Sequence, residues 1–145
     1  MTERTVFQST SRKQVLRLAP QATVRDAARV MTRAGCGSVL VMDPPDVLLG
    51  ILTERDLMTR VLARGLNPDT ATVREVMTPS PVCIPPETKV SDAVVLMLEK
   101  GFRHLPVVSG QKILGVFSSR DALPREIGTA FSQVEFNEQV NDALG

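Results

Sequence analysis

Tryptophan and tyrosine are absent from this sequence of 145 residues, and its five phenylalanines are scattered. Without stacking aromatics, and with a net charge of only +1 and no block of Lys or Arg, the chain lacks the features that nucleic-acid binding requires. No apolar stretch approaches the roughly 20 residues of a transmembrane helix, and no signal-peptide core follows Met1. We therefore expect a cytosolic protein with neither a nucleic-acid nor a membrane partner.

Residues that commonly carry catalysis are also few. The chain has one histidine and no tyrosine, and no nucleophile stands beside a base, so we expect no enzymatic activity and no catalytic cofactor. Cys36 and Cys83 lie far apart and match no metal or redox motif. We expect both thiols to be reduced and partly buried.

The sequence does contain an internal repeat. The block Val24–Gly35 returns as Val90–Gly101, and Gly50–Asp56 returns as Gly115–Asp121. Two copies of one unit imply a pseudo-symmetric pair in which each copy covers apolar surface that the other cannot bury alone. With 43% hydrophobic residues, the chain can fill one shared core or two small ones.

Each copy predicts the same order of elements, helix, strand, strand and helix, in a mixed α/β fold with a short sheet. Apolar residues at i, i+3, i+4 and i+7 indicate amphipathic helices that end at Gly35 and Gly101. Short strands near 15–18 and 82–84 introduce the copies, and Pro124 interrupts the last helix of the second copy. The predicted parts are a flexible arm (1–13), repeat 1 (14–66), repeat 2 (67–124) and a partly helical C-terminal extension (125–145).

In both copies a Thr or Ser is followed three residues later by Asp, where a strand passes into a helix. Thr53 and Ser118 are natural N-caps, and Asp56 and Asp121 favour the positive end of the helix dipole. The same geometry suits a ligand, because helix N-termini attract phosphate and a fixed carboxylate accepts the hydroxyls of a ribose. Capping and ligand binding both remain open interpretations of these four residues.

Taken together, these features resemble a tandem pair of cystathionine-beta-synthase (CBS) domains, the Bateman module, over about residues 14–124. The segments that carry the resemblance are Val73–Thr78, Thr88–Ala93, Gly101–Val108 and the two Gly-to-Asp segments. The resemblance implies two pseudo-symmetric CBS repeats that form one stand-alone regulatory module. It also implies that an adenosyl ligand binds in clefts between the paired repeats. AMP is the first candidate, and ADP, ATP, NAD(H) and S-adenosylmethionine are the others.

The resemblance also assigns roles to individual residues. It implies that Asp56 and Asp121 hold a ribose and that Thr53 and Ser118 lie near ribose or phosphate. The further ligand-binding residues that it implies are Val39, Val82, Leu105 and Pro106 on the strands, and the basic Arg55, Arg103, His104 and Arg120. The alternatives are that Arg103 is solvated beside a hydrogen-bonded His104, and that Arg55 and Arg120 pair with nearby acids. Because repeat 1 has Gly37 and Ser38 in place of Arg103 and His104, we expect two chemically unequal sites.

We therefore expect a sensor that signals its occupancy to an effector protein, which the sequence does not identify. The alternative is a ligand-free module whose function is dimerisation or protein interaction. Family resemblance also implies a homodimer of two Bateman modules. The predicted contacts for that dimer are Leu57, Val61, Leu62 and Met97 on the amphipathic helices.

Overall fold

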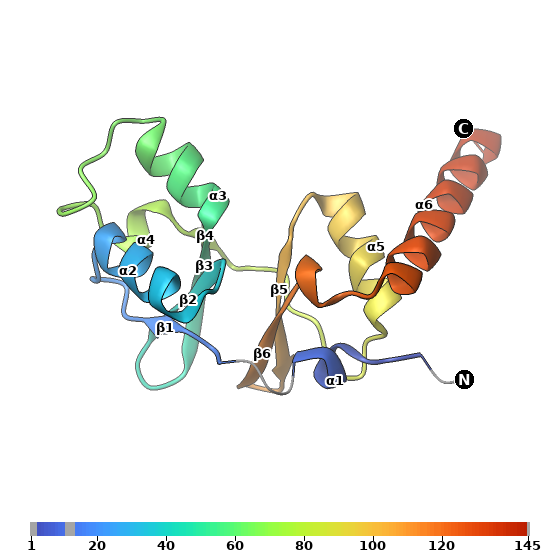
Figure 1. Ribbon diagram of the computed structural model, residues 1–145, viewed down its shortest axis with the longest axis horizontal. Coiled ribbons are helices and arrows are strands. Elements are labelled where there is room, and N and C mark those ends of the chain that lie inside the picture. Colours follow the sequence, from blue (N-terminus) through green and yellow to red (C-terminus); the bar gives the residue numbers. More distant parts are fainter. Residues whose placement is uncertain (1–2, 11–13, 145) are drawn as a thin grey trace. The chain divides into compact units, whose positions relative to one another are not determined.

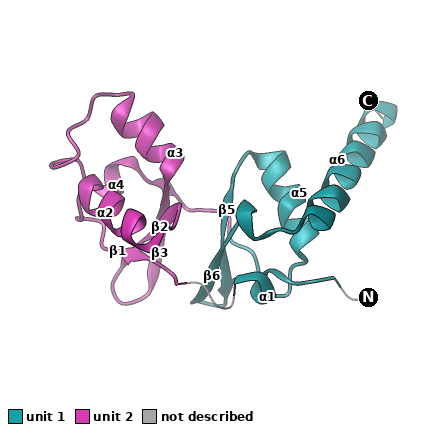
Figure 2. Cartoon of the chain, viewed as in Figure 1, with its two compact units in different colours: residues 1–13, 83–145 teal, residues 14–82 magenta. Residues whose placement is uncertain are grey.

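The computed structural model describes residues 3–10 and 14–144 and divides into two compact units (Figures 1 and 2). One unit holds residues 14–82, and the other holds residues 83–145 together with the N-terminal segment. This boundary differs from the one predicted at residue 66. Residues 67–82 belong to the first unit because Ala71, Val73 and Val76 are buried in its core.

The unit 14–82 combines a four-stranded sheet with short helices. Its elements are β1 (Arg17–Leu18), α2 (Val24–Ala34), β2 (Ser38–Asp43), β3 (Val47–Thr53), α3 (Glu54–Asp56), the π-helical segment η1 (Leu57–Leu62), α4 (Val73–Val76) and β4 (Thr78–Pro79). The strand order is β1-β2-β3-β4, with β1 parallel to β2 and the other neighbours antiparallel. The apolar face of α2 packs against the sheet, so Val24, Ala27 and Met31 share one core with Val39 and Leu52.

The second unit contains a two-stranded sheet, a helix of the same length as α2, and a longer C-terminal helix. Its elements are α1 (Val6–Thr10), α5 (Val90–Lys100), β5 (His104–Ser109), β6 (Lys112–Ser118), the 3-10 turn η2 (Ser119–Asp121) and α6 (Pro124–Leu144). In place of the strand predicted over 82–84, Ile84 forms an isolated parallel bridge with Val107. A separate core forms around Phe117, Leu105 and Val90.

The repeat that the sequence predicts is confirmed in the backbone. The β2–β3 and β5–β6 ladders shift register at the same point, at Val41/Met42 and Val107/Val108. The helices α2 and α5 end at Gly35 and Gly101, whose φ values of +65° and +81° are the left-handed conformation that glycine adopts without strain. The mixed helix and strand fold with two small sheets is therefore as predicted.

The N-terminal segment is packed on the second unit. Val90 N–H donates to the Arg4 carbonyl (2.9 Å), and Val6 N–H donates to the Thr88 carbonyl (2.8 Å). Val6 is fully buried. The prediction of a flexible arm over 1–13 is therefore wrong for residues 4–10, because apolar burial and main-chain hydrogen bonds hold them in place. Residues 1, 2 and 11–13 of that prediction lie outside the described residues.

The same contacts occur in the first unit, where the segment 71–77 makes them. Val24 N–H donates to the Ala71 carbonyl (2.9 Å), and Val73 N–H donates to the Ala22 carbonyl (2.8 Å). Residues 4–10 therefore correspond to residues 71–77. Residues 71–77, which precede repeat 2 in the sequence, therefore pack in the unit of repeat 1. Residues 4–10, which precede repeat 1, pack in the unit of repeat 2.

A glycine lies where each of these segments approaches the sheet. A Cβ on Gly50 would stand 2.5 Å from Met77 Sδ and 2.7 Å from the Thr78 carbonyl oxygen. A Cβ on Gly115 would stand 3.2 Å from Thr10 Oγ1. The glycines of the two Gly-to-Asp segments thus allow close backbone approach.

Two of the predicted dimer contacts are wrong. The side chains of Val61 and Met97 are only 6% and 5% exposed, because they face the cores of their own units. Leu57 is also packed against the first core. Leu62, in contrast, is 77% exposed.

The C-terminal extension is helical from Pro124 to Leu144, which is more than the partial helix that the sequence predicted. The predicted interruption at Pro124 is confirmed, because η2 ends at Asp121 and α6 begins at the proline. The helix packs against α5 (Figure 1). Ala130 is fully buried there, and Asn137 donates a hydrogen bond of 3.3 Å to Glu99.

Candidate ligand-binding turns

The first candidate site is the turn from β3 into α3. Both the N–H and the hydroxyl of Thr53 donate to Asp56 Oδ2, at 3.0 and 3.1 Å. Asp56 Oδ1 lies 3.6 Å from Nε of Arg60, and Nη1 of the same arginine donates to the Met77 carbonyl at 2.8 Å. Asp56 is only 7% exposed. The carboxylate is therefore fixed by its cap and enclosed by one arginine.

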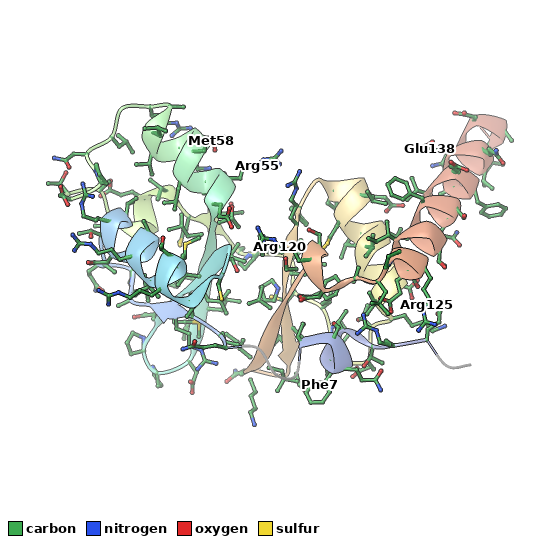
Figure 3. The ribbon with its side chains drawn as sticks, in the orientation of Figure 1. Phe7, Arg55, Met58, Arg120, Arg125 and Glu138 are labelled. Carbon is green, nitrogen blue, oxygen red and sulfur yellow. The ribbon has the colours of Figure 1, made fainter. Side chains whose placement is uncertain are left out.

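The second candidate site is the turn from β6 into η2. Ser118 N–H donates to Asp121 Oδ2 at 2.8 Å, as Thr53 does to Asp56 in the first turn. Asp121 is half-buried and so more accessible than Asp56. The exposed Arg120, labelled in Figure 3, stands inside the same turn.

The beginning of β5 lies against this second turn. Ser119 N–H donates to the Arg103 carbonyl (3.1 Å), and His104 is opposite Ser118 in the β5–β6 ladder. Arg103 is exposed and His104 is half-buried. The structure thus brings together five of the predicted site residues, namely Arg103, His104, Ser118, Arg120 and Asp121.

The first turn has the same backbone geometry with different side chains. The Gly37 carbonyl accepts from Glu54 N–H at 3.0 Å, which matches the bond between Arg103 and Ser119 in the second unit. A glycine therefore stands where the second turn has an arginine, and Arg55 is the basic residue of the first turn. This arrangement makes the two turns chemically unequal.

Two of the four apolar residues predicted to bind the ligand lie in the cores of their units. The side chains of Val39 and Leu105 are 1% and 0% exposed, because strand alternation directs them inward. Both side chains are part of the cores, and the role of these two residues in ligand binding stays a prediction. Pro106 is also buried, and its carbonyl accepts from Ile84 N–H (2.9 Å). Val82 ends the first unit with a 40% exposed side chain.

Sequence reasoning missed the ion pair of Arg4 and Glu126. Arg4 donates to both carboxylate oxygens of Glu126, at 2.8 and 3.1 Å, and to the carbonyl of Asp121 at 3.0 Å. The hydrogen bond from Arg4 holds the pKa of Glu126 below its usual range and raises the pKa of Arg4. The available signal was the place of Glu126 in the first turn of a helix that begins at Pro124, where a carboxylate caps free N–H groups.

Two further features bear on the class of protein. Over residues 3–10 and 14–144, no helix has both the length and the apolar character needed to cross a bilayer. The same residues contain no group of three or more His, Cys, Asp and Glu side chains arranged to hold a metal ion.

Comparison with known proteins shows the family to which this chain belongs. The model of the CBS domain matches residues 8–63 and 73–126. The chain belongs to the CBS-domain family. An uncharacterized protein of Methanopyrus kandleri is 35% identical over 117 residues, which cover 80% of this CBS pair and 60% of that protein. This chain therefore spans well under two thirds of that relative's length.

Solved structures resemble the CBS pair as well. A protein with CBS domains from Burkholderia ambifaria has a TM-score of 0.76 and 32% identity, covering 81% of this chain and 90% of that chain. A CBS-CP12 protein from bloom-forming cyanobacteria, described as hexameric, has a TM-score of 0.77 and 28% identity, covering 83% of this chain and 67% of that chain. The tandem CBS architecture predicted from the repeat is thereby confirmed.

Proposed function

We propose that this CBS pair is a regulatory module that binds an adenosyl ligand, with AMP as the first candidate, and signals its occupancy to a protein partner. The observation that carries the proposal is the common placement of Asp56 and Asp121. Each carboxylate is held through Oδ2 by the main-chain N–H of Thr53 or Ser118 at a strand-to-helix turn. A carboxylate held in this way presents its second oxygen in a defined direction, which suits recognition of the paired hydroxyls of a ribose.

The second turn is the better candidate for a nucleotide with a phosphate. Asp121 is more accessible than Asp56, and Arg103 and Arg120 supply positive charge within the same unit. The first turn has Gly37 beside it, and Arg60 already lies near Asp56. We infer that the second turn binds an anionic adenosyl ligand more tightly than the first.

The competing function is a ligand-free interaction module in which both aspartates only cap helices. The enclosure of Asp56 by Thr53 and Arg60 favours that reading at the first turn. The family membership supports a regulatory rather than a catalytic role. The absence of enzymatic activity and the cytosolic location stay predictions from the sequence.

Thermal-shift and calorimetric titrations with AMP, ADP, ATP, NAD, NADH and S-adenosylmethionine test the proposal. A ligand at about 100 times its dissociation constant stabilises the fold by about 2.7 kcal/mol, which a melting curve detects. Asp121→Asn should weaken binding about 10- to 150-fold, because charged hydrogen bonds are worth about 1.5–3 kcal/mol. Asp56→Asn should have a similar effect only if the first turn is also occupied.

The matched control is Asp26→Asn. Asp26 makes the same reciprocal capping box with Thr23 at the start of α2, at 3.1 Å in both directions, but lies outside the Gly-to-Asp segments. We expect this variant to lose some stability and no ligand affinity. Unchanged affinity and stoichiometry in Asp56→Asn and Asp121→Asn as well, or no binding of any compound, would leave the capping role alone.

A further inference from the structure

The second ligand-binding turn is not followed by a continuous helix. In the first unit Leu57 keeps a helical conformation (φ −62°, ψ −40°), and η1 follows the turn directly. In the second unit η2 ends at Asp121, Ala122 is extended (φ −80°, ψ 141°), and α6 begins at Pro124. A proline has no N–H to donate to the preceding turn. The chain after Asp121 is therefore held by contacts other than those of a helix.

Arg4 and Glu126 supply such contacts. Nη2 of Arg4 donates to the Asp121 carbonyl at 3.0 Å and to Oε1 of Glu126 at 2.8 Å. The same Oε1 accepts from Leu123 N–H at 2.7 Å. A hydrogen-bonded path thus runs from the Asp121 carbonyl through two side chains to the main chain of Leu123, on the other side of the extended residue. All four residues belong to one unit (Figure 2).

Asp121 is consequently held at two points. Its Oδ2 accepts from Ser118 N–H at 2.8 Å, and its carbonyl accepts from Arg4 at 3.0 Å. Holding the carbonyl restricts the backbone that carries the carboxylate, and so it fixes the direction of the second carboxylate oxygen. A group that is already ordered binds a ligand more tightly, because it does not lose that freedom on binding.

Arg4 itself is placed by the docking of the N-terminal segment. Its carbonyl accepts from Val90 N–H at 2.9 Å. Two residues further along, Val6 is fully buried and donates to the Thr88 carbonyl at 2.8 Å. The guanidinium therefore reaches the second turn from the docked segment.

We propose that Arg4 is a positioning residue for the second turn: it holds Asp121 in the conformation that receives a ribose, and it thereby couples ligand binding to the docking of residues 4–10. The inference rests on the proposed function, because it requires a ligand at Asp121. Such coupling is reciprocal, so a bound ligand also strengthens the docking of the segment. A protein partner that displaces the segment would weaken ligand binding.

The ion pair distinguishes positioning from direct contact with a phosphate. Glu126 accepts two hydrogen bonds from the guanidinium of Arg4 and neutralises its charge. The positioning of Asp121 affects the recognition of ribose, which AMP and adenosine share. A phosphate contact, as predicted for Arg103, affects AMP alone.

Calorimetric titrations of the full chain with AMP and with adenosine test the proposal at a temperature where every variant is folded. Arg4→Met should weaken the binding of both compounds about tenfold, within the range of about 5- to 150-fold that is typical of coupled sites. Arg4→Lys should weaken it less, because an ammonium still pairs with Glu126 but lacks the planar fork of donors. Val94→Ala, in the core of the same unit, and Arg25→Met, at an exposed ion pair of the first unit, are the controls. Both controls should keep the affinity of the parent.

Amide hydrogen exchange tests the two parts of the proposal separately. Without ligand, Ser118 N–H should exchange faster in Arg4→Met than in Val94→Ala, because the turn opens locally. In the parent, saturating AMP should slow the exchange of Val90 N–H, which bonds the segment, more than that of Val24 N–H, its match in the first unit. Arg4→Met should abolish this difference.

Several results would overturn the inference. They are equal affinities of the parent and Arg4→Met, a loss for AMP alone, a loss of the same size in Val94→Ala, and unchanged exchange of Ser118 or Val90. A parent that binds neither compound would refute the proposed function and the inference with it. A parent that binds both compounds no better than Arg4→Met does would refute the inference alone.

Discussion

The ion pair of Arg4 and Glu126 should stabilise the second unit measurably. Substitution of Arg4 by Met keeps an unbranched apolar stem and removes three hydrogen bonds, two to the carboxylate and one to the carbonyl of Asp121. The side chain of Glu126 is 9% exposed and retains only its bond from Leu123 N–H at 2.7 Å. A carboxylate that loses its cation in such a place is strongly destabilising.

The magnitude can be estimated from these contacts. Hydrogen bonds to charged groups contribute about 1.5–3 kcal/mol each when buried, and breaking a buried pair costs about 3–5 kcal/mol. Because the side chain of Arg4 is 31% exposed, solvent screening reduces this, and we expect Arg4→Met to lower the free energy of unfolding by about 2 kcal/mol. The melting temperature should fall by about 4–8 °C.

The pH dependence of this loss identifies its cause. Arg4 lowers the pKa of Glu126, so the pair contributes fully above the usual glutamate pKa of about 4.3 and is lost as the pH falls through the folded pKa. The difference between the parent and Arg4→Met should therefore be constant near neutral pH and shrink below about pH 4.

Two variants act as controls in chemical denaturation at several pH values. Arg25→Met removes an ion pair with Asp69 whose side chains are 43% and 58% exposed, so it should have a much smaller effect. Glu126→Gln combined with Arg4→Met should show non-additivity, as for any directly coupled pair. A loss below about 0.5 kcal/mol, within the range of exposed ion pairs, or a loss that persists unchanged at pH 3, would refute the reasoning.

Two further predictions concern the close approach of the segments and the charge of the second turn. Gly50→Ala should lower the free energy of unfolding by about 1–3 kcal/mol, because its Cβ would stand 2.7 Å from the backbone oxygen of Thr78. Gly115→Ala should lower it by less, because the added Cβ meets Thr10 Oγ1 at 3.2 Å. Equal melting temperatures of the two variants would contradict this. Arg103→Ala should weaken AMP binding roughly 10- to 150-fold and leave adenosine binding unchanged, because a guanidinium recognises phosphate. Equal losses for both compounds in calorimetry, with Lys112→Ala as the control, would make Arg103 a surface residue.

The sequence was sufficient for the features that depend on local pattern. The spacing of Val24, Ala27 and Met31 predicted helix α2, and its residues face the core as that spacing requires. Gly35 and Gly101 marked the helix ends correctly. Repetition then placed Asp56 and Asp121 at equivalent turns, because copies of one motif fold alike.

The features that the sequence did not predict depend on contacts between distant segments. Residues 4–10 lack the periodicity of a long helix, and their burial follows from hydrogen bonds to residues 86–90, far along the chain. Arg4 and Glu126 could not be paired for the same reason. Val61 and Met97 were misassigned because an apolar residue on an amphipathic helix has the same pattern whether it faces a core or a partner.

The segments 71–77 and 4–10 are connected to the two turns in different ways. In the first unit Arg60 lies near Asp56 and donates to the Met77 carbonyl, whereas in the second unit Arg4 of the segment itself bonds the turn. Arg4 and Ala71 occupy corresponding positions, since their carbonyls accept from Val90 and Val24. Arg4 also bonds the carbonyl of Asp121 and the carboxylate of Glu126, whereas alanine has no polar side chain. A ligand can shift an equilibrium only through groups that differ between its bound and free states. If a ligand binds at Asp121, the side chain of Arg4 thus links its site to both the N-terminal segment and α6.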